Sequence, residues 1–244
     1  MPVSSQFDRL SIVLVNTRNP LNIGAAARAM SNFGFRDLRL VNPYEESFRE
    51  ARSAVGASEV LRDARVYSSV ADAVADCTFV VGTTSGARRD LQQPLEVLDT
   101  VAKLMRRQLR TGRIAILFGS EKRGLSNSDF SHCHRRLRIP TREEHGSMNL
   151  GQAVAVCLCE FVRASHSAGK RSPRPENTKP LASELERVTS LLLEALQLSG
   201  YTPAGTASQE SLRRLIYRLT LSCDDAKTWQ GILRQIVWKL KQRV

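Results

Sequence analysis

Residues 113–125 have the sequence RIAILFGSEKRGL, in which five consecutive apolar residues end at Gly119. A near-continuous apolar run is typical of a parallel strand that other elements cover on both faces. The turn from Gly119 to Gly124 follows this run directly. Ligands of open α/β sheets bind at the carboxyl ends of the strands. The segment therefore predicts a central strand with a ligand-binding loop at its end.

Other segments extend the same pattern along the chain. Further strands are predicted at residues 11–16, 37–42, 78–83 and 135–140. Helical patterns lie between them, such as residues 22–33, where Gly34 follows in the position of a left-handed C-cap. Strands that alternate with helices indicate an α/β domain with a mostly parallel sheet, which we assign to residues 1–164.

The composition changes after this domain. Residues 165–180 are dominated by Pro, Ser, Lys and Arg and lack an apolar period, which predicts an exposed basic linker. Residues 181–244 are helical in pattern again. We therefore expect a small helical C-terminal extension, called the tail below.

Capping signals and apolar stripes divide the tail into three helices. Ser183 and Glu186 have the spacing of a capping box, Gly200 would end the first helix, and Asp224 or Asp225 could cap the third. The apolar residues expected to face the core of the tail are Leu185, Val188, Leu192, Ala195, Leu212, Leu215, Ile216, Leu219, Ile232, Leu233, Ile236 and Leu240. Its basic residues either contact RNA or form an ordinary solvated surface.

The charge balance points to a polyanionic partner. The chain has 36 Lys and Arg against 24 Asp and Glu, a formal net charge of +12. Such a field attracts nucleic acid, although an ordinary basic protein would have the same charge. No apolar run approaches the roughly 20 residues of a membrane span, and the first ten residues lack the apolar core of a secretory signal. We expect a cytoplasmic protein.

The cysteines and histidines do not predict a metal site. The five cysteines are odd in number and scattered, as expected for reduced thiols. His132 and His134 flank Cys133, but no second ligand pair stands at zinc spacing. Metal binding is therefore not expected.

The segment NIGAAAR, from Asn22 to Arg28, opens the helix that follows the first strand. Asn22 is a natural N-cap, and the alanines allow another backbone to come close. Arg28 points about 160° away from the apolar stripe of the helix. It is either a solvated arginine or a residue that acts outside its own core.

Two further segments could carry chemistry. The loop after residue 118 has the glycine spacing of a phosphate-binding P-loop, but Leu125 stands where that motif requires lysine. Ser147 and Asn149 precede a long apolar helix, where backbone N–H groups favour anions, and each could be a simple cap. No Gly-x-Ser-x-Gly elbow supports a serine hydrolase that would use Ser147.

Taken together, these segments resemble the SPOUT superfamily of methyltransferases, in its TrmH branch. The matching residues are NIGAAARAM (22–30), LFGSEKRGL (117–125) and IPTREEHGSMNLGQAVAV (139–156), in the order and spacing of the three motifs of the branch. The likeness is closest to tRNA 2'-O-methyltransferases that act on nucleotide 32 of the anticodon loop. It continues through the tail, so it covers nearly the whole chain.

The resemblance implies a C-terminal trefoil knot in the α/β domain and a bent S-adenosylmethionine held by three loops. By position, the cofactor-binding residues are Thr83, Thr84, Ser85, Gly119, Glu121, Leu125, Ile139, Gly146, Ser147 and Met148. The resemblance further implies a homodimer in which Arg28 of one subunit meets the cofactor of the other. Arg28 would activate the ribose hydroxyl, while Ser147 and Asn149 orient the reactants.

The expected RNA contacts are Arg28, Arg88, Arg89, Arg213 and Arg214. The loop TSGARR (84–89) places its basic residues differently from the tRNA enzymes, so either Arg88 or Arg89 could touch RNA. One alternative function is a ribosomal-RNA 2'-O-methyltransferase of the same branch. Another is an inert RNA-binding protein on the same fold, which would have no use for Arg28 or Asn149.

Overall fold

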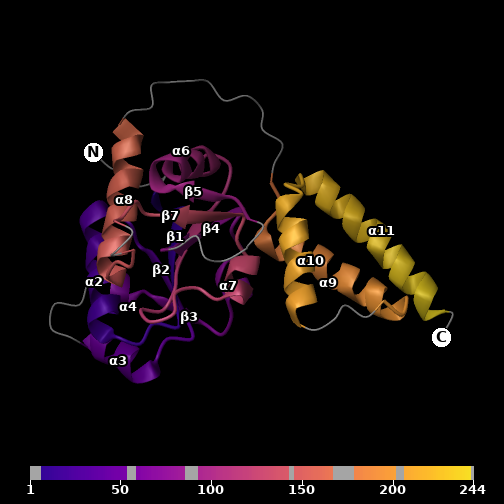
Figure 1. Cartoon of the computed structure of the whole chain (residues 1–244), viewed down its shortest axis with the longest axis horizontal. Coiled ribbons are helices and arrows are strands. Elements are labelled where there is room, and N and C mark those ends of the chain that lie inside the picture. Colours follow the sequence, from indigo (N-terminus) through magenta and orange to yellow (C-terminus); the bar gives the residue numbers. More distant parts are fainter. Residues whose placement is uncertain are drawn as a thin grey trace.

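The computed structural model of the protein describes residues 7–53, 59–85, 93–142, 146–166, 179–201 and 206–242 (Figure 1). Its centre is a seven-stranded sheet of order β3-β2-β1-β6-β4-β7-β5. All neighbouring strands are parallel. The strands are β1 (Leu10–Val15), β2 (Asp37–Val41), β3 (Arg65–Tyr67), β4 (Phe79–Thr84), β5 (Leu95–Val97), β6 (Ile114–Phe118) and β7 (Arg135–Arg138).

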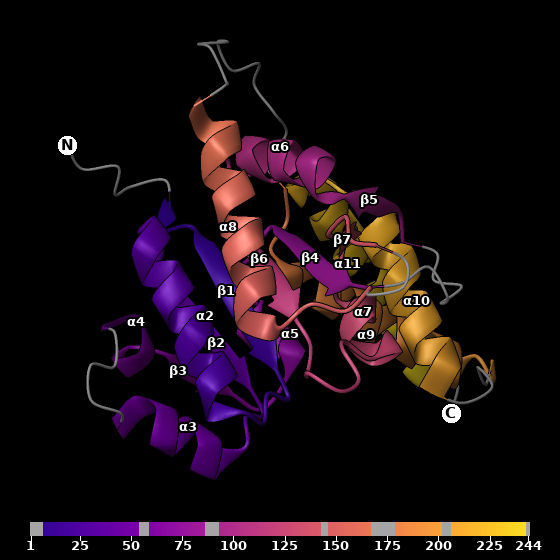
Figure 2. The same cartoon turned by 60° about the vertical axis from the view of Figure 1, so that its left-hand side comes forward.

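Helices cover both faces of the sheet, and three further helices, α9 to α11, form the tail at the end of the described chain. Figure 2 shows α2 and α8 side by side on one face. The helices are α2 (Pro20–Phe33), α3 (Glu45–Ser53), α4 (Glu59–Arg62), α5 (Val70–Ala73), α6 (Leu98–Gln108), α7 (Asn127–Ser131), α8 (Leu150–His166), α9 (Ala182–Leu198), α10 (Thr206–Arg218) and α11 (Cys223–Lys241). None of the helices in these described ranges is long and apolar enough to cross a membrane.

The central strand β6 explains the layering. Ile114, Ile116 and Phe118 pack into the core beneath α2, α6 and α8. Ala115 and Leu117 point to the opposite face and pack with residues of α5 and α7. Because side chains alternate along a strand, an unbroken apolar run supplies both cores. The predicted α/β class with a mostly parallel sheet is confirmed.

The amino ends of the strands are joined by a buried charge network. Arg39 is 1% exposed and binds Asp37 at 2.8 Å and Asp76 at 2.5 Å. Asp37 also accepts hydrogen bonds from Ser11 at 2.6 Å and from Arg113 at 2.9 Å. Burial alone would raise the pKa of Asp37, but bonds from Arg39 and Ser11 outweigh it and lower this pKa to about 2. The network holds the amino ends of these strands together.

The tail has a small core of its own, and its first helix starts differently from the prediction. Leu185, Val188 and Ala195 pack with residues of α10 and α11, as expected. The predicted capping box of Ser183 and Glu186 is wrong, because α9 begins at Ala182 and Glu184 accepts the Leu181 N–H at 2.8 Å. The helix ends at Leu198, two residues before Gly200, and this glycine has the expected left-handed φ of 81°.

The apolar stripes of α10 and α11 are narrower than predicted. Leu215, Leu219, Ile232 and Ile236 are exposed, so their predicted inward orientation is wrong. The predicted Ile216 and Leu233 are buried in the core of the tail, and Tyr217 and Val237, which were not predicted, are buried with them. Each of these helices touches the rest of the tail along a single line, which leaves its apolar flanks uncovered.

The third tail helix has a different cap from the predicted Asp224 or Asp225. Ser222 is the N-cap of α11 and forms a capping box with Asp225. The predicted linker 165–180 lies mostly outside the described residues, so the proposed division of the chain at that point stays a prediction.

Candidate active site

Three loops meet at the carboxyl ends of neighbouring strands of the sheet. The strands β6, β4 and β7 are neighbours, with Gly82 opposite Leu117 and Thr84 opposite Arg138. Because the strands are parallel, the residues after their carboxyl ends lie together. These residues belong to the predicted cofactor-binding segments that contain Thr83, Gly119 and Ile139.

The loop between Gly119 and Leu125 is closed on itself. Ser120 and Gly124 form a short bridge, and the Gly124 N–H donates to the Ser120 carbonyl at 2.8 Å. A Cβ at Gly119 would overlap the backbone of Gly124 and Leu125, and Gly124 has a φ of 65°. Both positions therefore require glycine. Leu125 is buried, so only its backbone can face a ligand.

A chain of side-chain hydrogen bonds connects the three motif segments. The Asn22 amide donates to Glu121 Oε1 at 2.9 Å. The Asn149 amide donates to Asn22 Oδ1 at 2.8 Å. Asn22 comes from the first motif, Glu121 from the second and Asn149 from the third. We call this chain of three residues the brace.

Glu121 also holds the segment before α2. Its carboxylate accepts the backbone N–H groups of Arg18 at 3.4 Å and Asn19 at 3.3 Å. Partial burial raises the pKa of Glu121, but the bond from Asn22 and the backbone N–H groups outweigh it and lower this pKa. Glu121 is therefore an ionised acceptor that ties its loop to the start of α2.

Asn22 is not the N-cap of α2, and that prediction is wrong. The helix begins at Pro20, and the side chain of Asn19 accepts the Leu21 N–H. Proline suits the first helical position because its missing N–H would have no partner there. Asn22 is therefore buried inside the first turn, where its amide bonds the other two motifs. Sequence reasoning missed it as a site residue, although the Asn19–Pro20 pair signals the earlier start.

Asn149 caps α8 while it takes part in the brace. Its Oδ1 accepts the N–H groups of Gly151 at 3.0 Å and Gln152 at 3.3 Å. A Cβ at Gly151 would lie 2.5 Å from the Cβ of Ala25, so α8 touches α2 closely at this point. The alanines of α2 thus allow the close backbone approach that the sequence predicted. The entrance of α8 is fixed on α2.

Arg28 lies on the outer face of α2. It is exposed, and it shares this face with Leu21, which is 77% exposed, and with Ala25. The three residues are spaced i, i+4 and i+7, so they form one stripe. The guanidinium therefore points away from the core of its own chain, as the sequence predicted.

The other predicted site residues are placed as follows. The Thr83 hydroxyl donates to the Leu117 carbonyl at 2.9 Å, which joins β4 to β6. Ser85 and Ser147 are exposed. Thr84, Ile139, Gly146 and Met148 are half-buried. Arg88 and Arg89 lie outside the described residues. Among the residues that are described, no cluster of three or more His, Cys, Asp or Glu could hold a metal.

Arg213 and Arg214 have protein partners. Arg213 Nε is 3.0 Å from Glu186, and its Nη1 is 3.2 Å from the Ser131 hydroxyl. Glu186 is also 3.2 Å from His132 Nδ1. These contacts dock α9 and α10 onto α7, which directly follows the loop that ends at Leu125. Arg214 is 3.5 Å from Glu210 on its own helix. RNA binding by either arginine stays a prediction.

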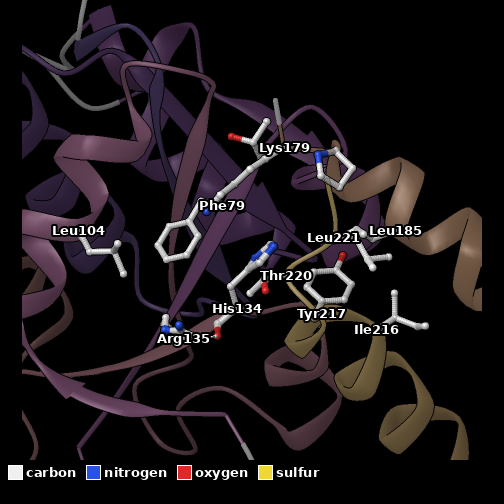
Figure 3. Close-up of a pocket in the computed structure, with 12 residues that line it drawn as sticks. Phe79, Leu104, His134, Arg135, Lys179, Leu185, Ile216, Tyr217, Thr220 and Leu221 are labelled. Atoms are coloured by element: carbon white, nitrogen blue, oxygen red, sulfur yellow. Dashed lines mark hydrogen bonds between the residues drawn. The ribbon is translucent and has the colours of Figure 1, made fainter. Parts of the chain in front are cut away.

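A small cavity of about 60 Å³ lies at the opposite edge of the sheet (Figure 3). Phe79 and His134, at the amino ends of β4 and β7, line it together with Tyr217 of the tail, and the His134 and Tyr217 ring centroids are 4.9 Å apart. Burial lowers the pKa of His134 to about 3, assisted by Lys179 and Arg135. Its neutral ring accepts the Val80 N–H at 3.1 Å. The cavity is part of the joint between tail and sheet and is separate from the three loops.

The fold, the three loops and the brace define a methyltransferase of the SpoU class. Residues 9–159 match the model of the SpoU rRNA Methylase family, and the chain belongs to this family. The predicted resemblance to the SPOUT methyltransferases is thereby confirmed.

Named relatives extend the similarity into the tail. The tRNA (cytidine/uridine-2'-O-)-methyltransferase TrmJ of Pectobacterium atrosepticum is 32% identical over 235 residues, 94% of this chain and 97% of that protein. The tRNA (cytidine/uridine/adenosine-2'-O-)-methyltransferase TrmJ of Pseudomonas aeruginosa is 36% identical over 220 residues, 87% of this chain and 84% of that protein. The crystal structure of TrmJ from Z. mobilis ZM4 has a TM-score of 0.79 and 32% identity, covering 93% of this chain and 98% of that one.

Proposed function

We propose that this protein transfers the methyl group of S-adenosylmethionine to a ribose 2'-hydroxyl of tRNA, in the anticodon loop. The observation that carries the proposal is the brace, because Glu121, Asn22 and Asn149 join the three motif segments beside three neighbouring strand ends. The similarity to TrmJ proteins through the tail favours tRNA over ribosomal RNA.

The cofactor would lie against the three loops. The backbone after Thr84, Phe118 and Arg138 leaves the strand ladders of β4, β6 and β7 at neighbouring points, and Gly124 has open space where a side chain would stand. Backbone N–H and carbonyl groups at these positions can form hydrogen bonds with a ligand. Thr83–Ser85, Gly119–Leu125, Ile139 and Gly146–Met148 would bind it. When bound, S-adenosylmethionine supplies a methyl group on a positively charged sulfur.

Arg28 would act on the ribose oxygen. A guanidinium keeps its proton at neutral pH, so Arg28 does not serve as a general base. It stabilises the negative charge that develops on the 2'-oxygen and binds an adjacent phosphate, while the proton passes to phosphate or water. The exposed Ser147 hydroxyl, at the entrance of α8, orients the ribose. Asn149 acts through the brace, as a positioning residue.

The stripe of Leu21, Ala25 and Arg28 would face a second copy of the chain. Leu21 is a large apolar side chain left exposed beside this arginine. A two-fold contact through α2 covers Leu21 and brings Arg28 to the cofactor of the other subunit. We further propose the trefoil knot that the family implies. A chain that sediments as a monomer while fully active would contradict the shared site.

The proposal is tested by methyl transfer with the purified full chain. Labelled S-adenosylmethionine is supplied with tRNA and, separately, with ribosomal RNA, and the 2'-O-methyl nucleotides are mapped. Label at nucleotide 32 of tRNA is expected. Label in ribosomal RNA alone would identify the alternative methyltransferase. RNA binding without calorimetric binding of S-adenosylmethionine would identify an inert RNA-binding protein.

A further inference from the structure

We infer that one face of α11 binds the RNA backbone, at a part of the tRNA away from the methylated nucleotide. The face consists of Lys227, Gly231, Arg234, Trp238 and Lys241, and we call it the α11 face. The inference rests on the proposed function, because it assumes that tRNA is the substrate. Figure 1 shows α11 at the outer edge of the tail, far from α2 and α8.

The spacing of these residues makes them a single surface. They stand at i, i+4, i+7, i+11 and i+14, so a turn of 100° per residue keeps them within one stripe of the helix. At 1.5 Å per residue, the stripe is about 21 Å long. The buried side of α11, formed by Ala226, Leu233 and Val237, lies about 100° around the helix from the middle of this stripe. The α11 face is therefore a flank beside the core contact, and all five of its residues are exposed.

The charge of this helix has one sign beyond its first turn. Residues 226–242 contain four lysines and arginines and no aspartate or glutamate. Lys227 and Lys241 are 70% and 59% exposed, although Lys227 pairs with Asp224 at 3.8 Å and Lys241 with Glu194 of α9 at 2.8 Å. Arg234 is exposed and has no ion-pair partner in the part of the chain that the structure describes. A solvated helix surface ordinarily mixes both signs. A stripe of cations alone matches a row of phosphates.

Trp238 adds a second kind of contact. It is 53% exposed, in the middle of the basic stripe. Exposed aromatic rings between cations are typical of surfaces that bind unpaired nucleic acid, because bases stack on the rings. Trp229 lies nine residues earlier, which is 900° of helix rotation and places it on the opposite flank, with Ile232. The two tryptophans of the chain therefore report on different surfaces.

Gly231 is the third observation. Glycine inside a helix destabilises it relative to alanine. A Cβ at this position would have open space around it, and the φ of Gly231 is not positive, so neither packing nor backbone conformation requires glycine. Glycine at the centre of the α11 face does allow a ligand to approach the helix backbone closely. This is the explanation we adopt.

The surface differs from the arginines predicted earlier. Arg213 is 20% exposed and its guanidinium lies against Glu186, whereas Lys227 and Lys241 of the α11 face are 70% and 59% exposed even though each pairs with a carboxylate. Arg213 therefore attaches the tail to α7. The α11 face is the part of the tail that contacts RNA.

Intrinsic fluorescence tests the inference directly. Trp229→Phe leaves Trp238 as the sole emitter, and Trp238→Phe leaves Trp229. Addition of tRNA to the full chain, without cofactor, is expected to quench the first variant and not the second. Quenching of Trp229 alone would overturn the inference, because RNA would then bind the other flank.

Charge reversal supplies a matched comparison. Lys227→Glu with Arg234→Glu is expected to raise the Kd for tRNA at least tenfold and to flatten its salt dependence by about two units of log–log slope. Lys103→Glu is the control for the first change, since Lys103 is 67% exposed and also paired with an aspartate, on α6. Its Kd is expected to stay within twofold. Equal losses in both would reduce the effect to net charge and overturn the inference.

Gly231→Ala separates binding from folding. Added helix propensity should raise Tm, while the new methyl group weakens tRNA binding a few-fold. Binding unchanged in this variant and in Trp238→Ala would contradict the inference. A shift from dimer to monomer in the α11 variants with an unchanged tRNA Kd would instead identify the face as a contact between two copies. Because these are binding measurements, failure of wild-type methyl transfer on tRNA would count against the proposed function alone.

Discussion

Asn149 donates its side-chain amide to Asn22 across 2.8 Å, although 127 residues separate the two in sequence. The same Asn22 side chain donates to Glu121, so a single amide binds the second and third motifs at once. An amide can do this because it carries both a donor and an acceptor. A carboxylate or an apolar side chain at position 22 would lose at least one of the two bonds.

The first prediction therefore concerns the brace. Asn22→Asp would place a carboxylate against Glu121, and like charges at that separation repel. We expect affinity for S-adenosylmethionine to fall about tenfold or more at pH 7.5 and to recover partly at pH 5.5, as one carboxylate takes up a proton. Calorimetry at both pH values measures this affinity. Asn22→Leu is the control, since its loss should not depend on pH. A pH-independent loss in Asn22→Asp would show that the brace does not work through this contact.

The second prediction concerns Arg28. Arg28→Ala should lower single-turnover methyl transfer by at least roughly a hundredfold, because removing a charged donor to a developing oxyanion costs on the order of 3 kcal/mol. Cofactor affinity should change only a few-fold. Arg36→Ala removes an equally charged exposed residue just beyond α2 and should leave the rate unchanged. Equal effects of both substitutions would mean that Arg28 acts only through general charge.

The third prediction concerns acid stability. The folded pKa of Asp37 is about 2, below its ordinary 3.8, so the charged group stabilises the fold above about pH 4. That contribution, roughly 2 kcal/mol, should be lost as pH falls through 2. Chemical denaturation at several pH values measures the free energy of unfolding. In Asp37→Asn, stability should be lower at pH 7 and should fall less between pH 4 and 2. Identical slopes in both proteins would refute this assignment.

The fourth prediction separates docking from RNA contact at Arg213. If Arg213 docks the tail through Glu186, Arg213→Ala and Glu186→Gln should be coupled by about 1–2 kcal/mol in unfolding free energy. A double-mutant cycle measures this coupling. If Arg213 contacts a phosphate instead, Arg213→Ala should leave stability unchanged and lower the salt slope of tRNA binding by about one unit.

The sequence predicted the five longer strands and missed the two shortest. The strands β1, β2, β4, β6 and β7 have four to six residues and agree with the predicted ranges within one or two residues. The strands β3 and β5 have three residues each, lie at the edges of the sheet and have no fully buried residue, so they leave no apolar pattern. A periodic apolar pattern in the sequence indicates burial. A short edge strand is recognised only by its pairing with the neighbouring strand, which the sequence does not show.

The site was predicted in its loops but not in its connections. Glycine spacing located the loop at Gly119, since backbone geometry is written locally. The role of Asn22 depends on Glu121 and Asn149, which are about a hundred residues away. The local Asn19–Pro20 pair shows that Asn22 is not the cap, but it does not show what the amide binds. The wrong inward prediction for Ile232 and Ile236 has the same cause. The width of the buried stripe on a helix depends on the partner helix, which the local sequence does not show.

The parallel direction of all the strands separates two kinds of residue within one sheet. Asp37 and Arg39 lie at one edge and hold the fold, while the loops after β4, β6 and β7 lie at the other and form the candidate site. Substitutions in the loops can therefore alter the ligand site without disturbing the buried charges. Divergence within such a scaffold should concentrate at the carboxyl ends of the strands, which makes the loops the place to redesign the ligand site.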